Sequence, residues 1–578
     1  MDDNTHQQAL SSAKAGDYTR AILLIKPLAE KHPKPSRFFY DYLSILGWSG
    51  QHQQVITQSK IISLSTAPQY VLKTVAIAQR DQQLFFHAKR TYQLMIKRFP
   101  KSLDSKIGLS LILIDQKNYS SAKSWLSTLL RQYPRNISVL YALAYLHESQ
   151  HHYLQALPVY EKILAIKPTD RFSQKNKILA LNKLGASHLA LSLIKNNTLF
   201  TAKELASIRV NMAAHRIRWG EIPVLDETKR YVETDIAIND IQQNILSNTR
   251  LFGATDPLTL NERFDLLVAL RSRQLMPEVV QHYKQLIADK VSVPNYSKNA
   301  YCDALLTLRQ PLNAQHCYRD ILATGRQNVN TKIALFYALL ENENIPESQQ
   351  WIEKIVAEQP TVIKGADKRK ILKGDPQKTQ AETVNALSIA FAGNLEIAFQ
   401  RFSTLHGAAP YNINLTEELA NVYYWRGWPR KAQEEYLIGL HQEPKYIGLR
   451  RGQARNWQAL KEYPLAEKSI NRLYGIFPEN VHVAKQKKLW DIHNFREFKT
   501  DISSGKSNGG TNGSRDFTID SYLYSSPFDY NYRAFIHQRH SQADFTEGDG
   551  LLNHAGIGLE YTAPNILLSG ELHHNRFD

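Results

Sequence analysis

The C-terminal segment, residues 491–578, carries ionisable side chains that alternate with apolar ones, and its acidic residues outnumber its lysines and arginines. A surface lined by carboxylates concentrates cations and offers them weak, repeated sites, which is the chemistry of a conducting wall. For each position the alternative is an ordinary water-facing side chain with no role in selectivity. The candidates for such a wall are Glu497, Asp501, Asp520, Arg533, His537, Glu560 and Glu571.

No residue pattern in the chain is typical of catalysis or of a bound cofactor. The sequence has no glycine-rich phosphate loop, no His-Glu-x-x-His motif and no nucleophile elbow. The pairs His151-His152 and His573-His574 are adjacent residues, which cannot both face one metal ion from a regular helix or strand. We therefore expect a protein that is not an enzyme and has no cofactor or metal site.

The alternation that would position the wall residues indicates β-strands. Segments of about ten residues, such as 555–561 with its flanks, have the length that a tilted strand needs to cross a hydrocarbon core. This pattern predicts the first five or so antiparallel strands of an outer-membrane β-barrel, which five strands alone cannot close. A soluble antiparallel sheet with one buried face is the alternative. The expected connections are long at residues 506–514 and 541–552, and short at 526–531 and 562–565.

Upstream of residue 490, the sequence follows a repeat with a period of about 34 residues. Pro100, Pro134 and Pro168 are evenly spaced at this period, and an alanine stands at the same offset before each of them. Small residues let two antiparallel helices approach closely, and proline ends the second helix. The spacing predicts a mainly α fold, a tetratricopeptide solenoid. Its predicted packing positions are Ala21, Ala88, Ala122, Ala156, Ala190, Ala314, Ala398, Ala432 and Ala466.

The repeat is interrupted at roughly residues 195–260 and again at 361–378. The second interruption is basic and is interpreted as a solvated loop, with a docking patch as the alternative. The predicted domains are a first solenoid block at 1–200, a helical joint at 201–260, a second solenoid block at 261–490 and an incomplete barrel at 491–578.

Two further groups of side chains in the solenoid leave alternatives open. Cys302 and Cys317 fall on the two helices of one repeat, where a disulfide is possible and two buried thiols are favoured. Aromatic residues along the repeats could stack on sugar rings or pack in the core. Tyr423 and Trp457 occupy packing positions, whereas Tyr424, Trp425 and Trp428 are less determined.

The net charge of +17 is divided unevenly along the 578 residues. Residues 515–578 hold four basic and nine acidic residues, a balance of −5, so the remaining 67 basic and 45 acidic residues give +22. The basic part motivates nucleic-acid binding only as the weakest hypothesis. No run of 18 apolar residues is present, which excludes a transmembrane helix, and no signal peptide is visible at the N-terminus.

Three stretches resemble the outer-membrane export porins for the biofilm polysaccharide poly-β-1,6-N-acetyl-D-glucosamine. They are residues 213–219 (AAHRIRW), residues 520–527 (DSYLYSSP) and residues 545–561, which open with FTEG and close with AGIGLEY. Together with the repeats, the resemblance covers essentially the whole chain. The chain departs from the family pattern in two ways: no signal peptide is visible at its N-terminus, and it ends after about five strands.

The resemblance implies a periplasmic repeat domain that binds a polysaccharide deacetylase and guides the polymer to a pore. It also implies a barrel of about sixteen strands in outer-membrane lipid, through which the partly deacetylated polymer leaves. The alternative is a soluble repeat scaffold for protein assembly, with the C-terminal strands forming a small sheet.

Overall fold

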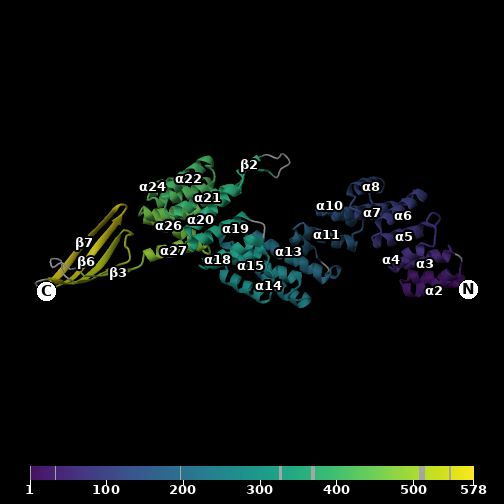
Figure 1. The fold of residues 1–578 in the computed structure, drawn as a ribbon, viewed down its shortest axis with the longest axis horizontal. Coiled ribbons are helices and arrows are strands. Elements are labelled where there is room, and N and C mark those ends of the chain that lie inside the picture. The colour runs from purple at the N-terminus through teal and green to yellow at the C-terminus, as the bar shows by residue number, and fades with distance from the viewer. Residues whose placement is uncertain are drawn as a thin grey trace. The chain divides into compact units, whose positions relative to one another are not determined.

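The computed structural model describes residues 2–32, 34–194, 197–224, 226–324, 328–365, 372–506, 515–545 and 548–577 (Figure 1). It has a tetratricopeptide-like α-solenoid followed by five antiparallel strands, which confirms the predicted fold class. The chain divides into two compact units, Met1–His215 with Gln243–Glu262, and Arg216–Gln242 with Arg263–Asp578.

The first unit is built from antiparallel helix pairs that recur with the period of the sequence repeat. Helices α6, α8, α10 and α12 begin at Phe85, Tyr119, Tyr153 and Ser187. The helices are α1 (Asp2–Lys14), α2 (Tyr18–Lys31), α3 (Arg37–Trp48), α4 (His52–Ser59), α5 (Gln69–Asp81), α6 (Phe85–Arg98), α7 (Leu103–Asp115), α8 (Tyr119–Gln132), α9 (Ile137–Ser149), α10 (Tyr153–Ile166), α11 (Arg171–Lys183) and α12 (Ser187–Leu193), followed by the short 3₁₀ turn η1 (Asn197–Leu199).

Capping residues and tight turns repeat with the same period as the helices. Ser102, Asn136 and Asp170 precede α7, α9 and α11, the first helices of three successive pairs, and each side chain accepts a hydrogen bond from a backbone N–H in the first turn of its helix. Between the helices of each pair one residue takes the left-handed conformation, as at Lys117 and His151. His151 therefore belongs to a turn of the repeat.

The helices cross closely because small residues lie at the crossings. All nine predicted alanine packing positions are completely buried in the structure. Glycine has the same role at two crossings, where an added Cβ would overlap the ring of Tyr92 at Gly108 or the ring of Tyr436 at Gly452. Packing at this density leaves no room for an additional methyl group.

The second unit continues with helix pairs after a pair of longer helices, α13 and α14, that the two units share. Arg216 of α13 makes ion pairs with Glu233 and Asp240 of α14, at 2.9 Å and 3.2 Å. The helices are α13 (Ala202–Gly220), α14 (Val232–Phe252), α15 (Pro257–Ser272), α16 (Met276–Ala288), α17 (Asn295–Thr307), α18 (Pro311–Thr324), α19 (Val329–Glu341), α20 (Ile345–Glu358), α21 (Pro376–Phe391), α22 (Leu395–Ala408), α23 (Ile413–Trp425), α24 (Pro429–Gln442), α25 (Ile447–Ala459), α26 (Tyr463–Ile476) and α27 (Val481–His493), with the 3₁₀ turn η2 (Glu227–Lys229) before α14.

Cys302 of α17 and Cys317 of α18 form a disulfide, with their Cα atoms 5.6 Å apart. The sequence analysis favoured two buried thiols, and the structure differs on this point. The residues are 15 positions apart on an antiparallel helix pair, so the crossing brings both side chains to one level.

The basic interruption at residues 361–378 contains a short antiparallel strand pair, β1 (Val362–Lys364) and β2 (Leu372–Gly374). Residues 366–371, which hold several of its cations, lie outside the described residues. Lys378 belongs to α21 and donates a hydrogen bond to the carbonyl oxygen of Val356 at 2.7 Å.

The C-terminal sheet has five strands in sequence order, each antiparallel to the next. They are β3 (Glu497–Lys506), β4 (Arg515–Tyr524), β5 (Tyr532–Phe545), β6 (Gly548–Ala563) and β7 (Ile566–Phe577). The turns that follow β4 and β6 are short, in agreement with the expected connections. The described part of the chain contains no helix long and apolar enough to span a membrane.

The expectation of a long polar loop at residues 541–552 is wrong. Strand β5 continues to Phe545 and β6 begins at Gly548, with Ser541 opposite Leu552 in the ladder. The residues are polar, but their side chains still alternate and their backbone groups pair, so the hairpin extends instead of opening. Residues 546–547 of this hairpin, and residues 507–514 of the loop expected at 506–514, lie outside the described residues.

Two glycines test the close helix crossing in the second unit. We expect Gly452→Ala to lower the free energy of unfolding by about 1–3 kcal/mol, because its Cβ would overlap Tyr436. The matched control is Gly475→Ala in α26, where a Cβ meets nothing within 4 Å and helix propensity favours alanine. The measurement is the thermal unfolding midpoint of the helical circular dichroism signal. Equal midpoints for the two variants would contradict the close packing at Gly452.

Candidate functional site

The register of the sheet places the seven predicted wall residues on one face, here called the polar face. Asp501 of β3 lies opposite Asp520 of β4, and Arg533 of β5 lies opposite Glu560 of β6. Because side chains alternate along each strand, the remaining members follow from the same register. They are Glu497, His537 and Glu571. That this face lines a lumen stays a prediction.

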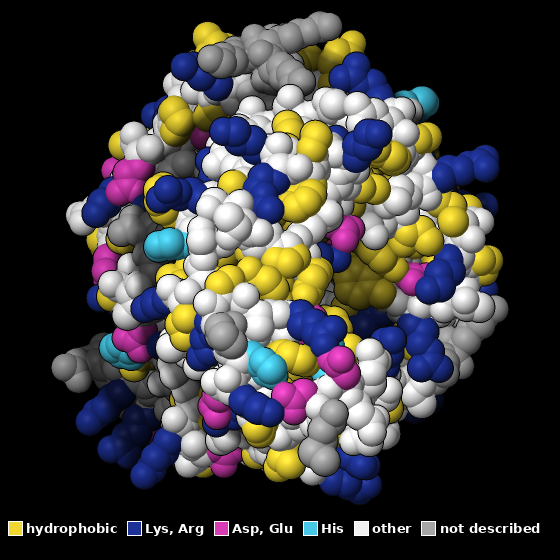
Figure 2. All heavy atoms as spheres, turned by 90° about the vertical axis from the view of Figure 1, so that its right-hand side faces the viewer, with side chains coloured by type: hydrophobic (Ala, Val, Ile, Leu, Met, Phe, Trp, Pro, Cys, Tyr) yellow, Lys and Arg dark blue, Asp and Glu magenta, His cyan; other side chains and the backbone are white. Residues whose placement is uncertain are grey.

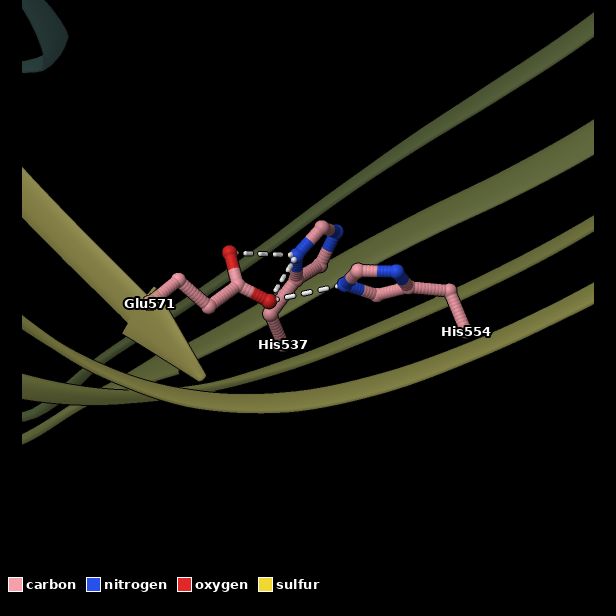
Figure 3. Close-up of side chains that lie close together, drawn as sticks. All are labelled: His537, His554 and Glu571. Carbon is pink, nitrogen blue, oxygen red and sulfur yellow. Dashed lines mark hydrogen bonds and ion pairs between the residues drawn. The ribbon is translucent and has the colours of Figure 1, made fainter. Parts of the chain in front are cut away.

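The centre of the polar face is a hydrogen-bonded network around His537 (Figure 3). Its Nε2 lies 2.6 Å from Asp520 Oδ1, and its Nδ1 lies 3.0 Å and 3.1 Å from the two carboxylate oxygens of Glu571. His554 Nε2 contacts the same Glu571 carboxylate at 2.7 Å, and His554 Nδ1 lies 2.6 Å from Asn575 Oδ1. Five side chains from strands β4 to β7 are thereby joined into one unit.

Neighbouring residues hold this network in place. The ring of Tyr522 stacks on that of His537, with centroids 4.0 Å apart. Gly556 lies opposite His537 in the ladder, and a Cβ there would overlap Glu571 Oε1. The missing side chain at Gly556 therefore creates the space in which His537, His554 and Glu571 meet.

Arg533 lies outside this network, at the end of the sheet that is next to the last helices. Its guanidinium donates to Glu497 Oε2 at 2.7 Å and to the carbonyl oxygen of His493, the last residue of α27, at 2.8 Å. Tyr530, in the turn before β5, donates to Glu467 of α26 at 2.7 Å. Of the predicted wall residues, Arg533 thus attaches the sheet to the solenoid, and Glu497 of β3 pairs with its guanidinium from within the sheet.

A cavity of about 630 Å³ lies beside this attachment, between the last helices and the turns of the sheet. Its lining mixes aromatic, basic and acidic side chains. Among them are Tyr463, Phe495, Arg496, Asn531 and Glu560.

The opposite face of the sheet is apolar and open. Phe498, Ile536, Ile557, Leu559 and Leu572 project from it and are between 56% and 80% exposed. A hollow of about 890 Å³ lies among several of these side chains. A contiguous apolar surface of this kind marks contact with lipid or with another protein.

The aromatic side chains of the solenoid fall into two groups. Tyr423, Trp425 and Trp457 pack against the helical cores. Trp428, at the start of α24, is 40% exposed, and the guanidinium of Arg426 lies over its ring at 4.0 Å from the centroid. Tyr424 is covered in the same way by the guanidinium of Arg455, at 4.2 Å.

Acidic and basic groups are partly buried between α23 and α25. Asn421 donates to Glu418 at 3.1 Å and accepts from Arg455 at 2.8 Å. Burial raises the pKa of Glu418 to about 7 and also raises that of its neighbour Glu417. Glu418 is therefore about half protonated near neutral pH.

The fold and the two-faced sheet define a class: a repeat protein continuous with strands of a membrane barrel. Residues 492–578 match the family described as "PgaA membrane beta barrel domain". The poly-beta-1,6-N-acetyl-D-glucosamine export proteins of Escherichia coli strains K12 and O157:H7 are each 25% identical over 546 residues, 92% of this chain. The chain spans 65% of the length of these relatives. The chain is therefore similar to these export proteins over most of its length, as the resemblance in the sequence indicated.

The solved structures compared with this chain share little sequence identity with it, and their TM-scores are low. The Cut9–Hcn1 tetramer of the APC/C is 13% identical, with a TM-score of 0.30, and covers 79% of this chain and 90% of its own. A tetratricopeptide repeat protein from Parabacteroides merdae is 13% identical, with a TM-score of 0.32, and covers 46% of this chain and 98% of its own. The two E. coli relatives are named as export proteins, in agreement with the expectation of a protein that is not an enzyme.

Sequence reasoning missed three parts of the central network: His554, Asn575 and Gly556. The alternation puts all three on the polar face, but none belongs to the seven residues predicted to form the wall. Aligning the predicted strands with one another could have identified this contact, because His554 and Asn575 are direct cross-strand partners.

The raised pKa of Glu418 makes the free energy of unfolding of the solenoid depend on pH. Between pH 4.5 and about 7 the folded protein retains a proton that the unfolded chain has released, so its free energy of unfolding falls as pH rises through this window. We expect Glu418→Gln to raise the free energy of unfolding by about 1–2 kcal/mol at pH 8 and to leave it unchanged near pH 5. Chemical denaturation at both pH values measures this.

The matched control is Glu434→Gln, which changes an exposed glutamate in the adjacent helix α24. Its free energy of unfolding should not differ from that of the parent protein at either pH. An equal stabilisation by both variants would show that net charge, and not the burial of Glu418, is responsible.

Proposed function

We propose that this chain is part of an outer-membrane porin that exports partly deacetylated poly-β-1,6-N-acetyl-D-glucosamine for biofilm formation. The observation that carries the proposal is the two-faced sheet, with ionisable side chains on one face and exposed apolar side chains on the other. The alternation of polar and apolar faces is what a strand between a lumen and lipid requires. The similarity to the two export proteins of E. coli supports the same substrate.

The charge of the polar face suits this polymer. A deacetylated glucosamine unit carries an ammonium group near neutral pH, and residues 515–578 have a net charge of −5. Acidic side chains along a lumen raise the local concentration of such a chain and bind each unit weakly, so that it can move on. Asp501, which makes an exposed ion pair with Lys499 at 3.3 Å and has a side chain that is 67% exposed, is accessible for this contact.

The solenoid is the proposed periplasmic part, which binds a polysaccharide deacetylase and guides the polymer to the barrel. Lys and Arg side chains are widespread over the face shown in Figure 2, and Asp and Glu are sparser there. The balance of +22 over residues 1–514 favours an acidic protein partner and disfavours direct attraction of a cationic polymer. Contact with sugar is better assigned to exposed aromatic residues, and Trp428 is the candidate.

Cell fractionation of the complete protein tests the location. We expect it in the outer-membrane fraction, because the apolar face of the sheet needs lipid to cover it. Recovery in the periplasmic or cytoplasmic soluble fraction would instead support the alternative, a soluble repeat scaffold with a small C-terminal sheet.

Charge reversal on the polar face tests the role of the carboxylates. We expect Asp501→Lys combined with Glu560→Lys to reduce the secreted polymer severalfold, because the wall would then repel ammonium groups. The matched control is Lys499→Glu, on the same face of β3, which makes the wall more acidic and should not reduce export. Secreted polymer is measured per unit of protein assembled in the outer membrane. Equal secretion by all variants would show that these charges are bystanders.

A further inference from the structure

We propose that His537, His554 and Glu571 form a binding site for a divalent transition-metal ion, with Zn²⁺ as the best fit. Within the described residues, these three are the group of histidine, cysteine and carboxylate side chains that could share one ion. They come from three adjacent strands, β5, β6 and β7, and Figure 3 shows them directed toward one point. The proposal does not depend on the export function.

The donor atoms are nearly in position for coordination. One donor atom from each of the three residues lies within 4.8 Å of the other two. His537 Nδ1 and His554 Nε2 lie 3.0 Å and 2.7 Å from Glu571 Oε1. In a tetrahedral zinc site with bonds of about 2.0–2.2 Å, neighbouring donor atoms are about 3.3–3.5 Å apart. Small side-chain rotations would therefore admit an ion, and the strand ladder need not change.

The outer nitrogens of both imidazoles already have partners of the kind that orient metal-bound histidines. His537 Nε2–H can donate to Asp520 Oδ1 at 2.6 Å, and His554 Nδ1–H can donate to Asn575 Oδ1 at 2.6 Å. These bonds leave the lone pairs of His537 Nδ1 and His554 Nε2 directed at Glu571. An acidic cluster on an open surface lacks such second partners.

Charge and burial agree with this assignment. The side chains of His537, His554 and Glu571 are only 9%, 12% and 21% exposed. Asp520 and Glu571 together supply two negative charges, which balance one divalent ion. Without an ion, the same ring nitrogens face the carboxylates of Asp520 and Glu571 and the side-chain amide of Asn575.

The ligand set also indicates which metals fit and what the ion would do. Two imidazoles and one carboxylate favour Zn²⁺, Cu²⁺ or Ni²⁺ over Ca²⁺ and Mg²⁺, which prefer sites made wholly of oxygen. Three protein ligands leave one position open to water or to a hydroxyl or amine group. The ion would join β5, β6 and β7 and present this open position on the polar face.

Metal titration of the complete protein in detergent, after removal of bound metal with a chelator, tests the site. We expect one equivalent of Co²⁺ to bind with visible absorption bands of low-coordinate nitrogen and oxygen ligation, and Zn²⁺ to displace it. His537→Ala, His554→Ala and Glu571→Gln should each weaken Zn²⁺ binding by about tenfold or more, measured by competition with a chromophoric chelator.

The matched controls are His540→Ala and His574→Ala, which remove imidazoles from the opposite face of β5 and β7. They should bind Zn²⁺ as the parent protein does. The migration of unheated samples in gels confirms that each variant has an assembled barrel. The proposal is wrong if the parent protein takes up no Co²⁺ at 100-fold molar excess, or if the controls weaken binding as much as His537→Ala. Neither result bears on export, which is measured separately.

Discussion

The backbone ladder of β3 to β7 is the constraint on which the proposed functions depend. Each strand pairs with its neighbour in the chain, so one register determines the facing of every side chain in the sheet. A slip of one residue would exchange the two faces and move His537 to the side occupied by Ile536. The same register brings His554 opposite Asn575 and sets Gly556 beside the ring of His537. The network on the polar face is therefore a consequence of strand pairing and not a separate feature.

The solenoid depends on a comparable constraint, but the residues that satisfy it lie within each helix pair. Each helix pair can close only where a small residue stands at the crossing, so alanine and glycine recur at fixed intervals. Because each pair contacts mainly its neighbours, the stack can continue without a single central core. The sheet begins at the end of this stack, where Arg533 donates to the carbonyl oxygen of His493 and Tyr530 donates to Glu467.

A feature could be predicted from the sequence when the interactions behind it join residues close together in the chain. The even spacing of prolines and alanines and the alternation in residues 555–561 are local patterns, and they predicted the solenoid and the strands. The length of the hairpin at residues 541–552 was missed because polar composition indicates a loop, whereas pairing across the hairpin decides the matter. The bond between Cys302 and Cys317 and the contact between His554 and Glu571 require distances between elements. Such distances are not contained in the spacing of residues along one strand or helix.

The hydrogen-bonded network around His537 also limits which carboxylates of the polar face can bind a cation that moves along it. Asp520 and Glu571 lie on the polar face, but both are engaged by histidine side chains and are largely covered. A carboxylate held between two imidazoles has little capacity left to bind an ammonium group. Attraction of a cationic polymer would then fall to more open carboxylates such as Asp501, whose ion pair with Lys499 is exposed, and the middle of the wall would be nearly neutral. A wall with charge at some positions and a neutral centre binds weakly overall, which is the condition for movement along it.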